Sequence, residues 1–120
     1  MKLSSTHLRY LLAIYHLATT NLDVSSMEVA NLLGVKRASV SRMMPLLMEK
    51  GLVVKKKYSK LYLTDVGFLT AKRLTKQVEM LEDVIKLRLH QPDETAWKSA
   101  CAAICELPVE IAMPIACENA

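Results

Sequence analysis

The sequence predicts a mostly α-helical protein, a winged helix-turn-helix followed by a helical dimerisation region. Three observations lead to this prediction: two short amphipathic helices meet at a glycine within residues 24–51, a β-prone hairpin follows, and apolar helical spacing then resumes. The 120 residues, 52% of them hydrophobic, are enough for one core and too few for two ordinary domains. We expect residues 1–64 to form the winged helix-turn-helix. Residues 65–120 should form a long helix and the helical dimerisation region.

The first helix is expected to cover the helix-turn-helix. Leu8, Leu11, Leu12 and Tyr15 recur at helical spacing, which predicts a helix from about Ser5 to Ala18. The polar TTNLD segment that follows should end it.

The two central helices have recognisable ends. Ser25 and Glu28 form a capping-box pattern at the start of the first, and Gly34 ends it. Gly51 should stop the second helix. Its buried stripe recurs at i, i+3, i+4 and i+7 and consists of Val40, Met43, Met44 and Leu47.

The opposite face of the second helix is small, polar and cationic. It carries Ser39, Ser41 and Arg42, with Lys36 and Arg37 at its amino end. A helix of this kind after a tight turn is typical of proteins that enter the major groove of DNA, and an ordinary helical hairpin is the alternative. Pro45 should leave the Ser41 carbonyl without its helical partner and bend the helix.

A lysine-rich hairpin is predicted after Gly51. The run LVVKKKYSKLYLT contains two β-prone segments around a polar turn, and its lysines would follow the phosphate backbone and supply affinity rather than sequence choice. Tyr58 and Tyr62 are more typical of strand packing than of DNA contact. The hairpin residues expected to contact DNA are Lys55, Lys57 and Lys60.

The residues after the hairpin predict helices that are longer than a winged helix needs. Thr64 or Asp65 should cap a helix to about Leu89, with a stripe formed by Ala71, Leu74, Val78, Leu81 and Ile85. Asp93 or Thr95 should cap the next helix, which ends near Glu106. Pro108 should open a last one, kinked by Pro114, which contains Ile111, Met113 and Ile115. A homodimer interface is the expected use of these apolar helices, and an intramolecular bundle is the alternative.

Charge and composition favour a cytoplasmic protein that binds a polyanion. Residues 1–90 carry 15 Lys and Arg against 7 Asp and Glu, a net +8, whereas residues 91–120 carry 1 against 5, a net −4. No apolar run approaches the ~18 residues of a membrane span, and the start of the chain lacks a signal-peptide core, so we expect a cytoplasmic protein with no membrane contact. Three cysteines in such a chain suggest reduced thiols.

Several strings resemble the diphtheria-toxin-repressor family of metal-dependent bacterial regulators, in particular its short manganese-transport-regulator branch without the SH3-like domain. They are YLLAIYHL at 10–17, VANLLGVKRASVSRMM at 29–44, EKGLV at 49–53 and LYLTDVG at 61–67. The resemblance implies a homodimer on double-stranded DNA with a palindromic operator. It places Lys36, Arg37, Ser39, Ser41 and Arg42 near the DNA, with Arg42 suited to guanine.

The resemblance also implies a metal site, and there this sequence departs from the family. Where the family has metal ligands, this chain has Arg9, Leu12, Val78, Cys101 and Cys105. Of these only Cys101 is a type that the family uses. Glu82 matches an ancillary carboxylate, but its partner histidine is Trp97. Mn²⁺ and Fe²⁺ prefer oxygen and imidazole, so the two cysteines would better suit Zn²⁺ or another soft ion. Core packing is the competing interpretation of both thiols.

These observations favour a sequence-specific, repressor-like regulator of transcription with a degenerate or altered metal site. One alternative is a true metal-dependent repressor that senses a divalent transition metal through Cys101, Cys105 and Glu82. Another is a protein-interaction module on the same fold, although the basic face argues against it. An enzyme is not expected, because the sequence has no Gly-rich phosphate loop, carboxylate pair or nucleophile–base arrangement.

Overall fold

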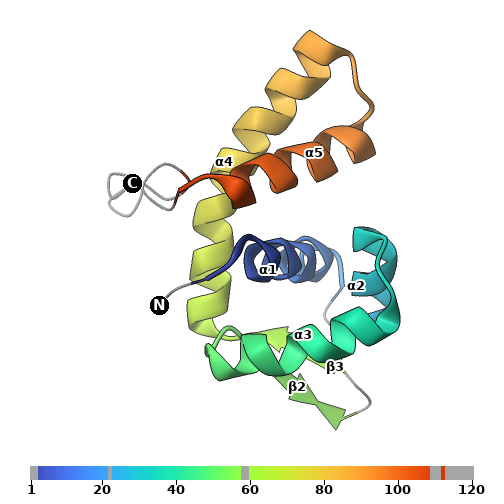
Figure 1. Cartoon of the computed structure of the whole chain (residues 1–120), viewed down its shortest axis with the longest axis vertical. Coiled ribbons are helices and arrows are strands. Elements are labelled where there is room, and N and C mark those ends of the chain that lie inside the picture. Colours follow the sequence, from blue (N-terminus) through green and yellow to red (C-terminus); the bar gives the residue numbers. More distant parts are fainter. Residues whose placement is uncertain (1–2, 22, 58–59, 109–111, 113–120) are drawn as a thin grey trace. The chain divides into compact units, whose positions relative to one another are not determined.

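The computed structural model describes residues 3–21, 23–57, 60–108 and 112, and forms two compact units, Met1–Ala71 and Lys72–Ala120. It is mostly helical with one small antiparallel sheet, which confirms the predicted fold class (Figure 1). The elements in chain order are α1 Ser5–Ala18, β1 Val24–Ser25, α2 Ser26–Leu33, α3 Arg37–Glu49, β2 Val53–Lys56, β3 Lys60–Leu63, α4 Asp65–Leu89 and α5 Asp93–Glu106.

Helix α1 has the predicted bounds, but its start relies on a cap that the sequence analysis missed. The Ser4 hydroxyl accepts from the His7 backbone N–H at 3.2 Å, and the Ser4 N–H donates to His7 Nδ1 at 3.0 Å. Two backbone donors that no helical carbonyl reaches are thereby satisfied.

The predicted capping box at the start of α2 is confirmed. The Glu28 N–H donates to Ser25 Oγ at 3.2 Å, and the Ser25 N–H donates to Glu28 Oε1 at 3.0 Å. Gly34 then ends α2 with φ at +69°, a conformation that only glycine adopts without strain. Two residues later α3 begins, so α2 and α3 form the tight helix-turn-helix visible in Figure 1.

The sheet has the strand order β1-β3-β2, and the predicted hairpin of β2 and β3 is confirmed. Register places Val53 opposite Leu63 and Lys55 opposite Leu61. The two-residue strand β1 was not predicted, because a pair of residues carries no measurable periodicity. It joins β3 through Val24 opposite Leu61 and Ser25 opposite Lys60.

One continuous core fills the first unit. It draws large apolar side chains from α1, α2, α3 and all three strands, so the exposed side of α3 is held on a well-packed base. The buried members of this core are Tyr10, Leu11, Ala13, Ile14, Val24, Val29, Ala30, Val40, Met44, Leu47, Leu52, Val53, Leu61 and Ala71.

Thr64 caps the start of α4, and it is one of the two residues predicted to do so. Its hydroxyl accepts from the Gly67 N–H at 3.0 Å and donates to the Gly51 carbonyl at 2.6 Å. Helix α4 then continues without interruption to Leu89.

In the second unit the bounds of α5 agree with the prediction, but its cap does not. Pro92 occupies the cap position without a side-chain hydrogen bond, so the expectation that Asp93 or Thr95 would cap α5 is wrong. The side chain of Asp93 instead lies 3.4 Å from Lys86 Nζ of α4. The last predicted helix, with Ile111, Met113 and Ile115, lies outside the described residues.

Within the described part of the chain, no helix has both the length and the apolar content needed to cross a membrane.

Candidate nucleic-acid interface

The two faces of α3 differ sharply. Val40, Met44 and Leu47 are buried in the core of the first unit, whereas Arg37, Ser41 and Arg42 are exposed. The helix therefore rests on one apolar stripe and presents a cationic, hydroxyl-bearing stripe to solvent. This is the arrangement that a helix needs in order to enter the major groove of DNA.

The amino end of α3 is suited to anionic groups. Lys36 is the cap residue, has extended backbone and makes no side-chain capping hydrogen bond. Lys36 and Arg37 are exposed, and Ser39 is half-buried. Backbone N–H groups at a helix start attract phosphate oxygens, and two cations beside them strengthen that attraction.

Tyr10 of α1 lies close to the charged side of α3. Burial raises the pKa of the Tyr10 hydroxyl, and the positive charges of Arg9 and Arg42 oppose this shift. The hydroxyl therefore stays protonated at neutral pH beside two guanidinium groups. No resemblance or periodicity in the sequence pointed to this neighbourhood.

The wing lysines lie on both faces of the hairpin. Because side chains alternate along a strand, Lys56 and Lys60, which are opposite each other, share the face of Tyr62. Lys55 is opposite Leu61 and shares the face that carries the buried Val53. Lys55, Lys56 and Lys57 are exposed, and Lys60 is half-buried. The tip of the turn, with Tyr58, lies outside the described residues.

Tyr62 connects the wing to the segment before α2, a role that the sequence analysis did not assign to it. Its hydroxyl donates to Asp23 Oδ1, and Lys56 Nζ lies 5.4 Å from the centre of its ring. The hydrogen bond to Asp23 raises the pKa of Tyr62. The residues around Tyr62 give no signal for this contact, because Asp23 is 39 residues away in the sequence.

Helix α3 passes through Pro45 without a break. Proline has no N–H, so it cannot donate to the carbonyl of Ser41 as an ordinary residue at this position would. Pro45 is exposed, on the side of α3 away from Met44 and Leu47. The bend expected at this point stays a prediction.

The residues considered for a metal site do not form one within the described chain. Cys101 and Cys105 are buried one turn apart on α5. Glu82 of α4 is an ion-pair partner of Lys86, at 3.7 Å. Among the described residues, no three His, Cys, Asp or Glu side chains lie close enough together to hold a metal ion. The oxygen and imidazole donors that Mn²⁺ and Fe²⁺ prefer are therefore not gathered here. The third cysteine of the chain, Cys117, lies outside the described residues.

The geometry of α2, α3 and the wing defines a winged-helix DNA-binding protein. Residues 2–61 match the model of the iron-dependent repressor family, N-terminal DNA-binding domain. The chain belongs to this family of repressors, which confirms the resemblance drawn from the sequence to the diphtheria-toxin-repressor regulators. A search of curated protein sequences finds no significant match.

Solved structures share the fold. The manganese regulator SloR is similar over 93% of this chain and 51% of its own, with 22% identity and a TM-score of 0.70. The apo form of the manganese-activated repressor ScaR is similar over 92% of this chain and 47% of its own, with 22% identity and a TM-score of 0.54. A hypothetical protein, SSo2273 from Sulfolobus solfataricus, is similar over 92% of this chain and 84% of its own, with 25% identity and a TM-score of 0.59. This chain thus spans about half the length of the two manganese-related proteins.

Proposed function

We propose that this protein is a sequence-specific repressor of transcription that binds a palindromic operator as a homodimer, with a metal response altered from that of its family. The observation that carries the proposal is the exposed stripe of Arg37, Ser41 and Arg42 on α3, in a domain matched to DNA-binding repressors. A side of α3 that served only packing would have no reason to expose two arginines.

Within this proposal, Arg42 reads a base and the other groups position the protein. A guanidinium fork matches guanine O6 and N7, and each such bidentate contact discriminates against a wrong base by about 1–3 kcal/mol. Lys36, Arg37, Ser39 and Ser41 lie at or near the amino end of α3, where phosphate contacts set the register. Lys55, Lys57 and Lys60 extend the contact along the backbone.

The homodimer is supported by an apolar stripe on α4. Met80, Val84 and Leu87 follow each other at four and three residues and share one side of the helix, and Leu87 is 75% exposed. Large apolar side chains gathered on one helix face in this way are typical of protein–protein contacts. Two copies of the chain would present two recognition helices, as a palindromic operator requires.

The altered metal response follows from the donor set. Arg9 carries a positive charge and would repel a cation near it. Glu82 is engaged by Lys86, and the buried thiols of Cys101 and Cys105 are poor ligands for manganese. A second candidate function, a repressor that responds to a soft divalent ion, is favoured by one observation, the placement of these two thiols on one buried face of α5.

Fluorescence anisotropy with the reduced protein tests the proposal. The probe is DNA from upstream of the protein's own gene, first with a chelator and then with Mn²⁺, Fe²⁺ or Zn²⁺ added in turn. Tight and salt-sensitive binding in the chelator is the expected result. Binding that appears only with Zn²⁺, and is lost in Cys101→Ala, would support the second candidate. No preference for the upstream DNA over random DNA in any condition would overturn both.

Arg42→Ala separates base reading from general attraction. It should lower the preference for operator over random DNA by about 5-fold to 100-fold. Arg88→Ala is a matched control, because it removes the same charge from an exposed position on α4. The double variant Lys55→Ala, Lys57→Ala should instead weaken binding to both DNAs and reduce the salt slope by about 2. Unchanged discrimination in Arg42→Ala would contradict the assignment of α3.

A further inference from the structure

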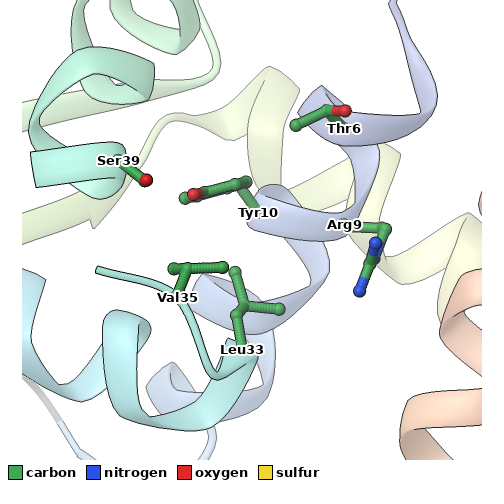
Figure 2. Close-up of a pocket in the computed structure, with 6 residues that line it drawn as sticks. All are labelled: Thr6, Arg9, Tyr10, Leu33, Val35 and Ser39. Carbon is green, nitrogen blue, oxygen red and sulfur yellow. The ribbon is translucent and has the colours of Figure 1, made fainter. Parts of the chain in front are cut away.

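A small cavity lies within the first unit, on the side of α1 that faces the helix-turn-helix. Figure 2 shows its six lining residues, Thr6, Arg9, Tyr10, Leu33, Val35 and Ser39. They come from α1, from the end of α2 with the turn after it, and from the first turns of α3. The proposed contacts with DNA make use of only one of them, Ser39.

Tyr10 provides the polar group of this cavity. Tyr10 is 6% exposed, and its hydroxyl is not a buried group left unsatisfied, because no buried side-chain oxygen or nitrogen among the described residues lacks a hydrogen-bond partner. In Figure 2 the hydroxyls of Tyr10 and Ser39 point toward each other across the cavity. A ligand acceptor placed between the two side chains would accept a hydrogen bond from the phenol hydroxyl. Because burial keeps the phenol protonated, it acts as a donor.

The charge of the cavity is positive, and its remaining wall is apolar. Arg9 lies at the end opposite Ser39, and within the described chain no carboxylate pairs with it. Leu33 and Val35 form the apolar wall. A donor and a cation beside an aliphatic surface are the complement of a molecule with an anionic head and a short hydrocarbon tail.

The size of the cavity limits the ligand. Its volume is about 150 Å³. An apolar protein cavity of about this volume holds one benzene, so the ligand has roughly six non-hydrogen atoms.

We propose that this cavity binds a small aliphatic monocarboxylate, whose carboxylate accepts from the hydroxyls of Tyr10 and Ser39 and is attracted by the positive charge of Arg9 while its tail packs on Leu33 and Val35. The site lies beside Ser39, at the start of α3. The inference extends to regulation, and this part rests on the proposed function. A bound anion adds negative charge next to the helix that meets the phosphates. It also competes with the phosphates for Arg42. Bound ligand therefore weakens binding to DNA.

The binding step is tested without DNA, so that its failure and the failure of the proposed function are distinguishable. Amide chemical shifts of the full chain are followed by two-dimensional NMR as sodium valerate is added, with sodium chloride and 1-pentanol as controls. Saturable shifts centred on Tyr10, Leu33 and Val35, produced by valerate alone, are the expected result. No saturation up to about 20 mM valerate, or equal shifts with chloride or pentanol, overturns the proposal.

Two variants identify the contacts. Tyr10→Phe removes only the hydroxyl and should weaken valerate binding by about tenfold or more. Arg9→Gln removes an exposed charge that does not touch the carboxylate and should weaken binding by about threefold. Tyr15→Phe is the matched control, because Tyr15 lies on the same helix, packs on the ring of Phe68 and does not line the cavity. Equal affinity in all three variants overturns the assignment, and the titration of the unmodified protein stands independently of how any variant folds.

The regulatory step is measured by anisotropy once an operator fragment has been identified. Saturating valerate should lower the affinity of the unmodified protein for that fragment by about fivefold or more, and leave that of Tyr10→Phe unchanged. Equal loss in both proteins would indicate a general ionic effect and overturn the regulatory part.

Discussion

The two units of this protein differ in which apolar side chains they bury and which they leave exposed. The first unit encloses leucine, isoleucine, methionine and valine side chains from every one of its helices and strands. The buried positions along α5 in the second unit are mostly small, namely Ala96, Ala100, Cys101 and Cys105 with Ile104. At the same time α4 leaves Met80, Leu87 and Leu89 more than half exposed. A DNA-reading surface needs a rigid base, whereas an assembly surface needs apolar area that is still uncovered.

This contrast has an energetic content. Burial stabilises by about 25 cal/mol per Å² of apolar surface, so alanines contribute much less than leucines. The first unit can therefore supply most of its stability from its own side chains. The second unit buries Leu74 and Val78 but leaves Met80, Leu87 and Leu89 exposed, and the burial of these three side chains would require another surface.

The largest expected effect tests the core beneath α3. Leu47→Ala should reduce the free energy of unfolding by about 2–5 kcal/mol, because Leu47 is fully buried. The adjacent Leu46→Ala, at a position that is 44% exposed, should cost less than about 1 kcal/mol. Urea unfolding followed by circular dichroism measures both. Similar costs for the two variants would mean that α3 is rotated from the orientation described.

Gly67 tests the tight contact between α4 and the loop before β2. A Cβ added to Gly67 would collide with the backbone carbonyl of Leu52, so Gly67→Ala should destabilise the protein by about 1–3 kcal/mol. Gly34→Ala meets open space and suffers only from its positive φ, which costs about 1 kcal/mol. Thermal unfolding of the two variants compares steric with conformational strain. A smaller loss of stability for Gly67→Ala than for Gly34→Ala would contradict the close packing.

The exposed stripe of α4 tests the second unit. Met80→Glu with Leu87→Glu should weaken the proposed dimer by about 30-fold or more, since charges would be buried at an apolar contact. Lys72→Glu places the same side chain at an exposed position of α4 off this stripe and is the control. Light scattering after size-exclusion chromatography reports the mass at several concentrations. A monomer in the unmodified protein would remove the contrast between the units.

The smallest effect concerns the entry to α2. Ser25→Ala removes the hydroxyl that accepts from the Glu28 N–H and should cost about 1 kcal/mol. Ser26→Ala, one residue into the helix, removes a hydroxyl that takes no part in the capping box and should cost a few tenths of that. If the two losses are equal, the capping box contributes no stability of its own.

The sequence allowed most of the fold to be predicted, because its signals were local. The pairing of Ser25 with Glu28, the glycine at 34 and the stripe of Val40, Met44 and Leu47 each lie within a few residues of one another. The features that were missed join distant segments or carry weak signals: the bond from Tyr62 to Asp23, the strand β1, and the cavity beside Tyr10. No spacing rule reports which side chains meet across the core.

The candidate site also contains features that the local sequence pattern predicts and features that it does not. That α3 exposes arginines and serines follows from helical periodicity, so Arg42 could be identified from the sequence. The split of the wing lysines between two faces depends on the register of β2 with β3, which places Lys56 rather than Lys55 beside Tyr62. The expected cap of α5 was wrong because the helix begins at Asp93 itself, which leaves Pro92 at the cap position, and the Asp93 side chain lies near Lys86 of the preceding helix.

The Thr64 hydroxyl has a mechanical consequence. One oxygen atom holds the carbonyl of Gly51, just beyond the end of α3, and the N–H of Gly67, in the first turn of α4. A twist of the first turn of α4 about its axis would displace that oxygen and pull on the Gly51 carbonyl. The start of α4 and the end of α3 are thus joined by this side chain, in addition to the close approach of Gly67 to the Leu52 carbonyl.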